Sequence, residues 1–248
     1  MSGVERVHGR EPDRWVRLDE TLSTNSAAAT LAAKGAVHGT VVIAEHQTQG
    51  RGRRGRVWTA RRGDAVTLSV ILRPNIPPGR VHLIALMAAL AVAEVAGPEA
   101  GIKWPNDVLC PQGLKLAGVL CEASFKGKGI DYAIVGIGLN VHGAPEALGA
   151  TFLDALSETK HERAQVAEDL VEALLGWLRA LEERPAHALE CWSERCIMWG
   201  GTVEVDGVKG VARRIDEDGA LIVESEGGQM RVVAGDVGLI QRAGPVDG

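Results

Sequence analysis

The spacing of apolar residues predicts helices in the first four fifths of the chain. Val166, Leu170, Leu174 and Leu178 recur every four positions, so one face of residues 162–183 is apolar and an amphipathic helix is predicted there. An alanine-rich helix is predicted to begin near Ser23 or Thr24 and to stop at Gly35. Two further helices are predicted over residues 80–96 and 185–198.

Short apolar runs bounded by glycine, proline or polar residues predict strands between these helices. They lie at residues 39–46, 64–72, 101–109, 115–125 and 131–141. Pro105 breaks the third run into two pieces, and a glycine-containing turn at 126–129 joins the last two runs into a hairpin. From residue 200 onward apolar and polar residues alternate between closely spaced glycine turns, which is typical of a small, barrel-like antiparallel β unit.

We therefore expect a disordered N-terminus over residues 1–14, a main domain over 15–198 and a β domain over 199–248. With 248 residues, 46% of them hydrophobic, the chain is long enough to bury a large core. The formal net charge of -5 argues against a broad nucleic-acid-binding surface.

The remaining bulk features indicate a cytoplasmic protein. Cys110, Cys121, Cys191 and Cys196 have no CxxC spacing and are expected to be reduced thiols. The N-terminus lacks an apolar signal core. The most apolar run, residues 81–96, is too short for a membrane span and reads as a buried helix.

Residues 50–56, GRGRRGR, concentrate four arginines and three glycines in one loop. Arginine binds phosphate and carboxylate oxygens through paired hydrogen bonds, and glycine lets the backbone fold closely around a ligand. The glycines also match the GxGxxG spacing of dinucleotide-binding loops, but no helix is predicted to follow them. We interpret this Arg–Gly loop as a clamp over a small anion, the alternatives being a solvated basic loop or an RNA-binding patch.

Two segments carry residue types that suit a nucleotide. In KWPNDVL, Lys103 suits a phosphate and Asp107 suits Mg²⁺, although an ordinary Asn-Asp turn is the alternative. In GIGLNV, Gly136 and Gly138 leave one strand face open for a planar ligand, and Asn140 can bind an adenine edge. Sheet packing with a turn asparagine is the alternative there.

Two more segments carry candidate polar groups. Lys115 begins an otherwise apolar strand, and Gly118 permits close backbone approach three residues later. Residues 23–25, STN, suit a helix N-cap that offers hydroxyl and N–H groups to a polar ligand.

Taken in chain order, STN, AEHQTQGRGRRGRVW, KWPNDVL, KLAGVLCE and GIGLN resemble the catalytic domain of biotin protein ligases, over roughly residues 15–240. The resemblance implies an α/β (α+β) fold in which helices flank a mixed β-sheet like that of class II aminoacyl-tRNA synthetases, followed by an SH3-like β-barrel. It implies that biotin and ATP, with Mg²⁺, give biotinyl-5′-AMP and pyrophosphate. Biotin then passes to one lysine of a biotin carboxyl carrier protein. Residues 15–198 would be the catalytic biotin- and ATP-binding domain.

The resemblance also implies roles for individual residues. The biotin-binding set is Ser23, Thr24, Asn25, Gln47, Gly50, Arg51, Lys115 and Gly118. The nucleotide-binding set is Arg53, Arg54, Trp58, Lys103, Asn106, Gly138 and Asn140. The catalytic set is Lys115, Arg53, Lys103 and Asp107, and Asp107 is also the implied metal ligand. Arg213 or Arg214 of the C-terminal unit would reach the nucleotide, and the Arg–Gly loop would order only when biotin or the adenylate arrives.

The partners and the competing functions follow from the same resemblance. About twenty residues precede Ser23, too few for the DNA-binding domain that some family members carry, so we expect a ligase that binds neither DNA nor membranes. A monomer and a homodimer both remain open. A lipoate–protein ligase is the alternative enzyme, and a nucleic-acid-binding module that uses the Arg–Gly loop is the alternative from another class.

Overall fold

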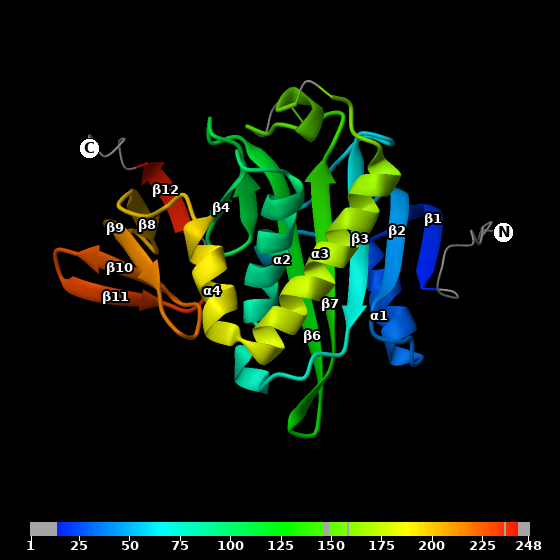
Figure 1. Ribbon diagram of the computed structural model, residues 1–248, viewed down its shortest axis with the longest axis horizontal. Helices are drawn as coiled ribbons and strands as arrows, with labels where there is room; N and C mark the ends of the chain where they lie inside the picture. Colours follow the sequence, from blue (N-terminus) through cyan, green and yellow to red (C-terminus); the bar gives the residue numbers. More distant parts are fainter. Residues whose placement is uncertain (1–13, 146–148, 158, 236, 243–248) are drawn as a thin grey trace.

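The structure is a computed structural model, and it describes residues 14–145, 149–157, 159–235 and 237–242. A seven-stranded mixed sheet has the order β1-β2-β3-β7-β6-β5-β4 (Figure 1). Among its described strands, only the β1–β2 pair is parallel. The strands are β1 (Trp15–Thr21), β2 (Thr40–Gln47), β3 (Ala65–Leu72), β4 (Gly101–Lys103), β5 (Asp107–Leu109), β6 (Lys115–Lys126) and β7 (Gly129–Asn140).

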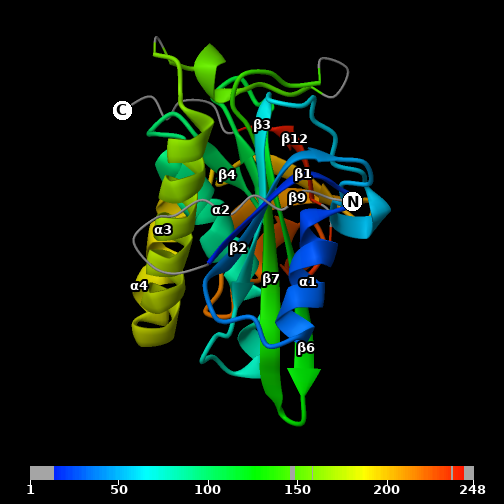
Figure 2. The ribbon, with the colours of Figure 1, turned by 90° about the vertical axis from the view of Figure 1, so that its right-hand side faces the viewer.

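Helices cover both faces of this sheet (Figure 2). On one face lie α2 (Leu83–Val95), α3 (Arg163–Glu183) and α4 (Pro185–Glu194). Nearly every side chain of α2 is buried, because it lies between the sheet and α3. On the other face lies α1 (Thr24–Ala33), whose small residues Ala28 and Ala32 let it approach a second apolar cluster on the sheet.

A five-stranded antiparallel sheet follows, with the order β11-β10-β9-β8-β12. Its strands are β8 (Thr202–Val205), β9 (Val208–Ile215), β10 (Leu221–Ser225), β11 (Gly228–Val232) and β12 (Val237–Gln241). It packs beside the β4 edge of the large sheet (Figure 1). There Trp104 Nε1 donates to the Gly219 carbonyl at 3.0 Å, and a Cβ on Gly219 would lie 2.5 Å from Leu83 Cδ2. Gly219 also has a φ of 73°, so glycine is required where the C-terminal sheet approaches helix α2.

Most elements predicted from the sequence are confirmed, including the two short strands around Pro105 and the β6–β7 hairpin. Three differences stand out. The strand β1 was missed, because its polar residues suit a sheet edge and break the apolar pattern. The helix predicted over 80–96 begins only at Leu83, after a 3-10 turn at Pro78–Arg80. The helix predicted over 185–198 ends at Glu194, because the next residues pair with β4 through Ile102.

Other expectations meet the structure as follows. The four cysteines are free thiols. Within the residues described above, no helix is long and apolar enough to cross a membrane. The predicted N-terminal disorder falls almost wholly on residues 1–13, which lie outside the described part of the chain.

Candidate functional site

A cavity of about 350 Å³ opens on the α1 face of the large sheet. This size falls within the range of about 300–1,000 Å³ typical of small-molecule sites. Its walls come from the N-terminus of α1, the Arg–Gly loop and strands β6 and β7. Of the residues singled out in the sequence, it is lined by Ser23, Thr24, Asn25, Gln47, Arg51, Arg53, Trp58, Asn106, Asp107, Lys115, Gly118, Gly136, Gly138 and Asn140.

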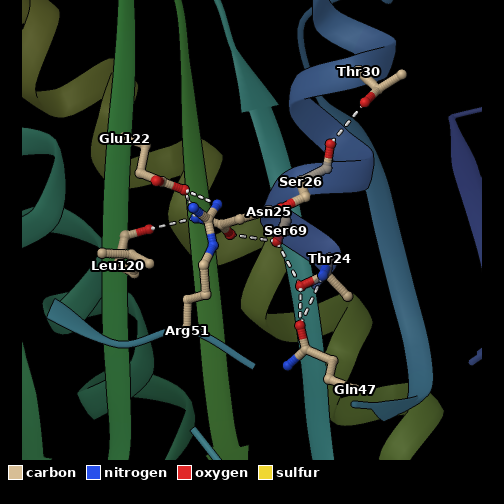
Figure 3. A network of polar contacts seen from close by, with 9 residues as sticks. All are labelled: Thr24, Asn25, Ser26, Thr30, Gln47, Arg51, Ser69, Leu120 and Glu122. Atoms are coloured by element: carbon tan, nitrogen blue, oxygen red, sulfur yellow. Dashed lines mark hydrogen bonds and ion pairs between the residues drawn. The ribbon is translucent and has the colours of Figure 1, made fainter. Parts of the chain in front are cut away.

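One end of the cavity holds a buried network of uncharged polar groups (Figure 3). Gln47 Oε1 accepts hydrogen bonds from the Thr24 backbone N–H at 2.7 Å and from Thr24 Oγ1 at 3.1 Å. Ser69 Oγ lies 2.8 Å from Thr24 Oγ1 and 2.6 Å from Asn25 Oδ1. Because Oε1 of Gln47 is used in this way, its Nε2 is the group left to donate to a ligand.

Asn25 connects this network to strand β6. Its Nδ2 donates to Glu122 Oε2 at 2.7 Å, and Arg51 Nη2 donates to the same oxygen at 2.7 Å (Figure 3). A Cβ on Gly136 would lie 2.1 Å from Asn25 Oδ1, so glycine is needed for Asn25 to lie against β7.

The Arg–Gly loop crosses the cavity in a defined conformation. Trp58 N–H donates to the Gly50 carbonyl and Gly52 N–H donates to the Arg56 carbonyl, which close the loop on itself. Arg53 Nη1 donates to Asn106 Oδ1 at 2.8 Å, and its Nη2 donates to the Gly235 carbonyl of the C-terminal unit at 3.1 Å. The expected ordering of the loop by its ligand stays a prediction.

The opposite end of the cavity is charged. Lys115 Nζ donates to Asp107 Oδ1 at 2.7 Å, and the Asp107 side chain is only 16% exposed. This pair also borders a neighbouring depression together with Lys103 and Arg242. Lysine and arginine side chains grouped in this way provide counter-charge for a polyphosphate.

Between the two ends, Trp58 lies against the strand glycines. A Cβ on Gly138 would lie 2.3 Å from Trp58 Cε2, and a Cβ on Gly118 would lie 3.6 Å from Trp58 Cζ3. The strand face expected to be open for a planar ligand is therefore covered by Trp58 and, at Gly136, by Asn25. The buried Trp58 Nε1 and Asn140 Oδ1 have no hydrogen-bond partner within the described residues, so each can bind a ligand group.

The carboxylate of Asp154 holds the segment that follows β7 in place. Asp154 accepts hydrogen bonds from His142 Nδ1 at 2.7 Å and from the N–H and Nδ1 of His161, each at 2.9 Å. Desolvation alone would raise the pKa of Asp154. The hydrogen bonds from the His161 backbone and the two imidazoles outweigh it and hold this pKa far below its usual range.

The residues available for a metal ion are few. Within the described part of the chain, no group of three or more His, Cys, Asp or Glu side chains is placed to hold one. Asp107 is the one carboxylate among the described cavity-lining residues, and Lys115 occupies its Oδ1. One carboxylate fits Mg²⁺ only if substrate phosphates supply further oxygens, which is the usual arrangement for this ion.

The remaining sequence candidates lie outside the cavity. Gly50 contacts the backbone of Trp58 where the Arg–Gly loop closes. Arg54 is exposed at the loop tip with a φ of 54°, and Lys103 faces the neighbouring depression. Neither Arg213 nor Arg214 lines either hollow, and Arg213 pairs with Glu224 at 2.6 Å. The C-terminal arginine that faces the neighbouring depression is Arg242.

Sequence reasoning also missed Ser69 and Glu122. Ser69 is fully buried within the apolar run of β3, which is a recognisable signal, because a buried hydroxyl needs a polar partner. Glu122 lies where β6 becomes exposed and gave no such signal.

Two family models, those of biotin and lipoate ligases, give the class of protein to which this fold belongs. The family model described as "Biotin/lipoate A/B protein ligase family" matches residues 20–140, and the model for the "Biotin protein ligase C terminal domain" matches residues 202–239.

Three relatives resolve the family further. The biotin–[acetyl-CoA-carboxylase] ligase of Mycobacterium tuberculosis is 37% identical over 246 residues, covering 90% of this chain and 89% of that protein. The ligase of the same name from Paracoccus denitrificans is 34% identical, covering 89% and 98%. The biotin protein ligase of Aquifex aeolicus, solved in complex with biotin and ATP, superimposes with a TM-score of 0.77 at 26% identity, covering 92% of this chain and 98% of that one. The chain therefore belongs to the biotin protein ligase family, whose activity is that of a biotin–[acetyl-CoA-carboxylase] ligase.

Proposed function

We propose that this chain converts biotin and ATP to biotinyl-5′-AMP and pyrophosphate inside the described cavity and then transfers biotin to a lysine of a biotin carboxyl carrier protein. The observation that carries the proposal is that one cavity has an uncharged polar end and a cationic end. A molecule with a polar ring at one end and a carboxylate at the other matches this arrangement, and so does its adenylate.

The uncharged end would bind the ureido ring of biotin. Gln47 Nε2 donates to the ureido oxygen, since its Oε1 is held by Thr24. Ser23 and Asn25 complete this end, and both are only 3% exposed. The rigid α1 N-terminus thus positions the ring before the reaction begins, and the carboxylate of biotin then points toward Lys115.

The cationic end would carry out the first step. A biotin carboxylate oxygen attacks the α-phosphorus of ATP, a new P–O bond forms, the bond to the β-phosphate breaks and pyrophosphate leaves. Both reactants are anions, so the barrier is largely electrostatic. Lys115 and Arg53 neutralise the developing charge on the α-phosphate, while Lys103 faces the departing phosphates from the neighbouring depression. Asp107 would hold Mg²⁺ together with the phosphates, and the ion would supply further counter-charge there.

The nucleotide would lie along β7. The second step requires that the carrier lysine reach the adenylate. Asn140 Oδ1 accepts from the amino group of adenine, and the Trp58 ring shifts from Gly138 to pack against the base. A neutral carrier lysine then attacks the carbonyl carbon of the mixed anhydride, the bond to the phosphate oxygen breaks, AMP leaves, and the new amide nitrogen loses a proton to solvent. The Arg–Gly loop excludes water from the anhydride until the carrier arrives.

The test is direct. The protein is incubated with biotin, ATP, Mg²⁺ and an apo carrier domain that a known family member modifies, and the carrier mass is measured. We expect a mass increase of one biotin, and lipoate in place of biotin should give none. An unmodified carrier, or equal modification by lipoate, would contradict the proposal.

A further inference from the structure

Glu122 joins two walls of the cavity through a single oxygen. Its Oε2 accepts from Asn25 at the N-terminus of α1 and from Arg51 of the Arg–Gly loop, both at 2.7 Å (Figure 3). Glu122 itself lies on β6, and it is not among the residues that line the cavity. The carboxylate therefore ties the loop to the helix without occupying the space of a ligand.

We propose that Glu122 is a positioning residue that latches the Arg–Gly loop over bound biotinyl-adenylate, an inference that rests on the proposed function. The side chain of Arg51 is held on Glu122, so the loop backbone around it is drawn across the cavity. Asn25 Oδ1 in turn lies 2.6 Å from Ser69 Oγ. The latch is therefore continuous with the polar end that binds the ureido ring.

The two bonds of Glu122 differ in exposure, and this difference suits a latch. Asn25 is buried, so its bond keeps the carboxylate in place. The Arg51 and Glu122 side chains are 44% and 41% exposed, so water screens their ion pair. Screened pairs of this kind change an equilibrium by about fivefold or less. The loop can therefore open for substrates and for the carrier, while closure still lengthens the lifetime of the adenylate in the site.

The test compares Glu122→Gln, Arg51→Gln and the double variant with the wild-type protein. Glutamine keeps an acceptor for Asn25 and removes the charge that holds Arg51. Two rates are measured without carrier. The first is the formation of biotinyl-adenylate in a single turnover, and the second is its subsequent loss from the site, measured as the appearance of free AMP. A matched control is Asp131→Asn, since Asp131 pairs with Arg73 at 3.7 Å on the same sheet and lines neither hollow.

We expect Glu122→Gln to raise the rate of adenylate loss about threefold to fivefold. Its formation rate at saturating substrates should stay within about twofold of wild type, because the charged end of the cavity is untouched. The double variant should lose adenylate no faster than Arg51→Gln alone, since both changes open one latch. Glu122→Asp, which shortens the side chain and keeps its charge, should fall between wild type and Glu122→Gln.

The outcomes separate the two proposals. A wild-type protein that forms no biotinyl-adenylate overturns the proposed function. A wild-type protein that forms it, with Glu122→Gln and Glu122→Asp both losing adenylate at the wild-type rate, overturns only the latch. Independent effects of the two glutamine substitutions, or an equal effect of Asp131→Asn, also overturn the latch.

Discussion

Removal of Lys115 tests the electrostatic account of adenylate formation most sharply. Lys115 Nζ lies 2.7 Å from Asp107 Oδ1, so Lys115→Ala removes a cation and also leaves a carboxylate with its partner gone. Loss of one preorganised donor costs about 3 kcal/mol in comparable sites, or about a hundredfold in rate. The second effect is repulsion between the unpaired Asp107 and the ATP phosphates. Two like charges about 5 Å apart at an effective dielectric constant of about 20 repel by about 3 kcal/mol before salt screening.

These two terms predict different behaviour for the single and double variants. Lys115→Ala should form adenylate about a thousandfold to ten-thousandfold more slowly, the smaller value applying where salt screens the repulsion. Adding Asp107→Asn removes the repulsion, so the double variant should recover to about a hundredfold below wild type. Asp107→Asn alone should lose about tenfold or less, since Lys115 remains to meet the phosphate.

The assay is biotin-dependent exchange of pyrophosphate into ATP, which reports the first step without the carrier. Lys126→Ala is the control, because Lys126 lies at the exposed far end of the same strand. A normal exchange rate in Lys115→Ala would refute the role given to Lys115. A double variant slower than Lys115→Ala would refute the predicted repulsion and would show that losing Asp107 as the proposed Mg²⁺ ligand outweighs it.

Three further predictions concern binding and stability. Gly136→Ala should weaken biotin binding about tenfold in calorimetry, because its Cβ would lie 2.1 Å from Asn25 Oδ1 and overpacking costs about 1–3 kcal/mol; wild-type affinity would contradict the part given to this contact in the biotin site. Asp154 has a folded-state pKa below its unfolded value, so its contribution to stability is complete above the unfolded value of about 3.9 and fades as the pH falls through the folded pKa. Asp154→Asn should therefore lower the thermal midpoint at pH 7, and the gap to wild type should close from about pH 4 downward; a gap independent of pH would contradict this. Gly176→Ala should stabilise the exposed middle of α3 by about 0.5–1 kcal/mol in urea unfolding, since no atom lies within 4 Å of the new Cβ, and any destabilisation would count against this helix geometry.

The elements that sequence pattern predicted are those in which local preference and burial agree. The α3 helix repeats its apolar residues along one face, and β3 is a continuous apolar run because it is buried along its whole length, so each leaves a local signal in the sequence. The missed strand β1 and the shortened helix α4 depend on partners far along the chain. Residue Arg14 pairs with Val41 just before β1, and Ile197 pairs with Ile102 just after α4. Neither pairing leaves a local trace that periodicity can detect.

The same division holds in the candidate site. The glycines of β6 and β7 were visible as unusual strand residues, and the structure shows that the neighbours they accommodate are Asn25 and Trp58. The group that fills the space beside a glycine depends on tertiary structure. The sequence therefore predicted close approach at these glycines, but a planar ligand was expected where the structure places Asn25 and Trp58. Asn140 was expected to bind an adenine edge, but only its Oδ1 is left for this, because its Nδ2 already donates to the Thr151 carbonyl at 2.9 Å.

The Arg–Gly loop shows why the charges within a loop do not by themselves predict what holds that loop in place. Taken alone, its four arginines repel one another, and only an external anion would order them. In the structure, the Arg51 charge meets Glu122, which is 71 positions away, and Arg53 meets the Asn106 amide, which is 53 positions away. The fold thus supplies part of the counter-charge itself. Because the Arg51–Glu122 pair is exposed and weak, it lowers the cost of closing the loop without removing the advantage of a ligand's own negative charge. A closed loop that is only slightly favoured is what a site needs if it must admit two substrates, protect an anhydride and then yield to a carrier.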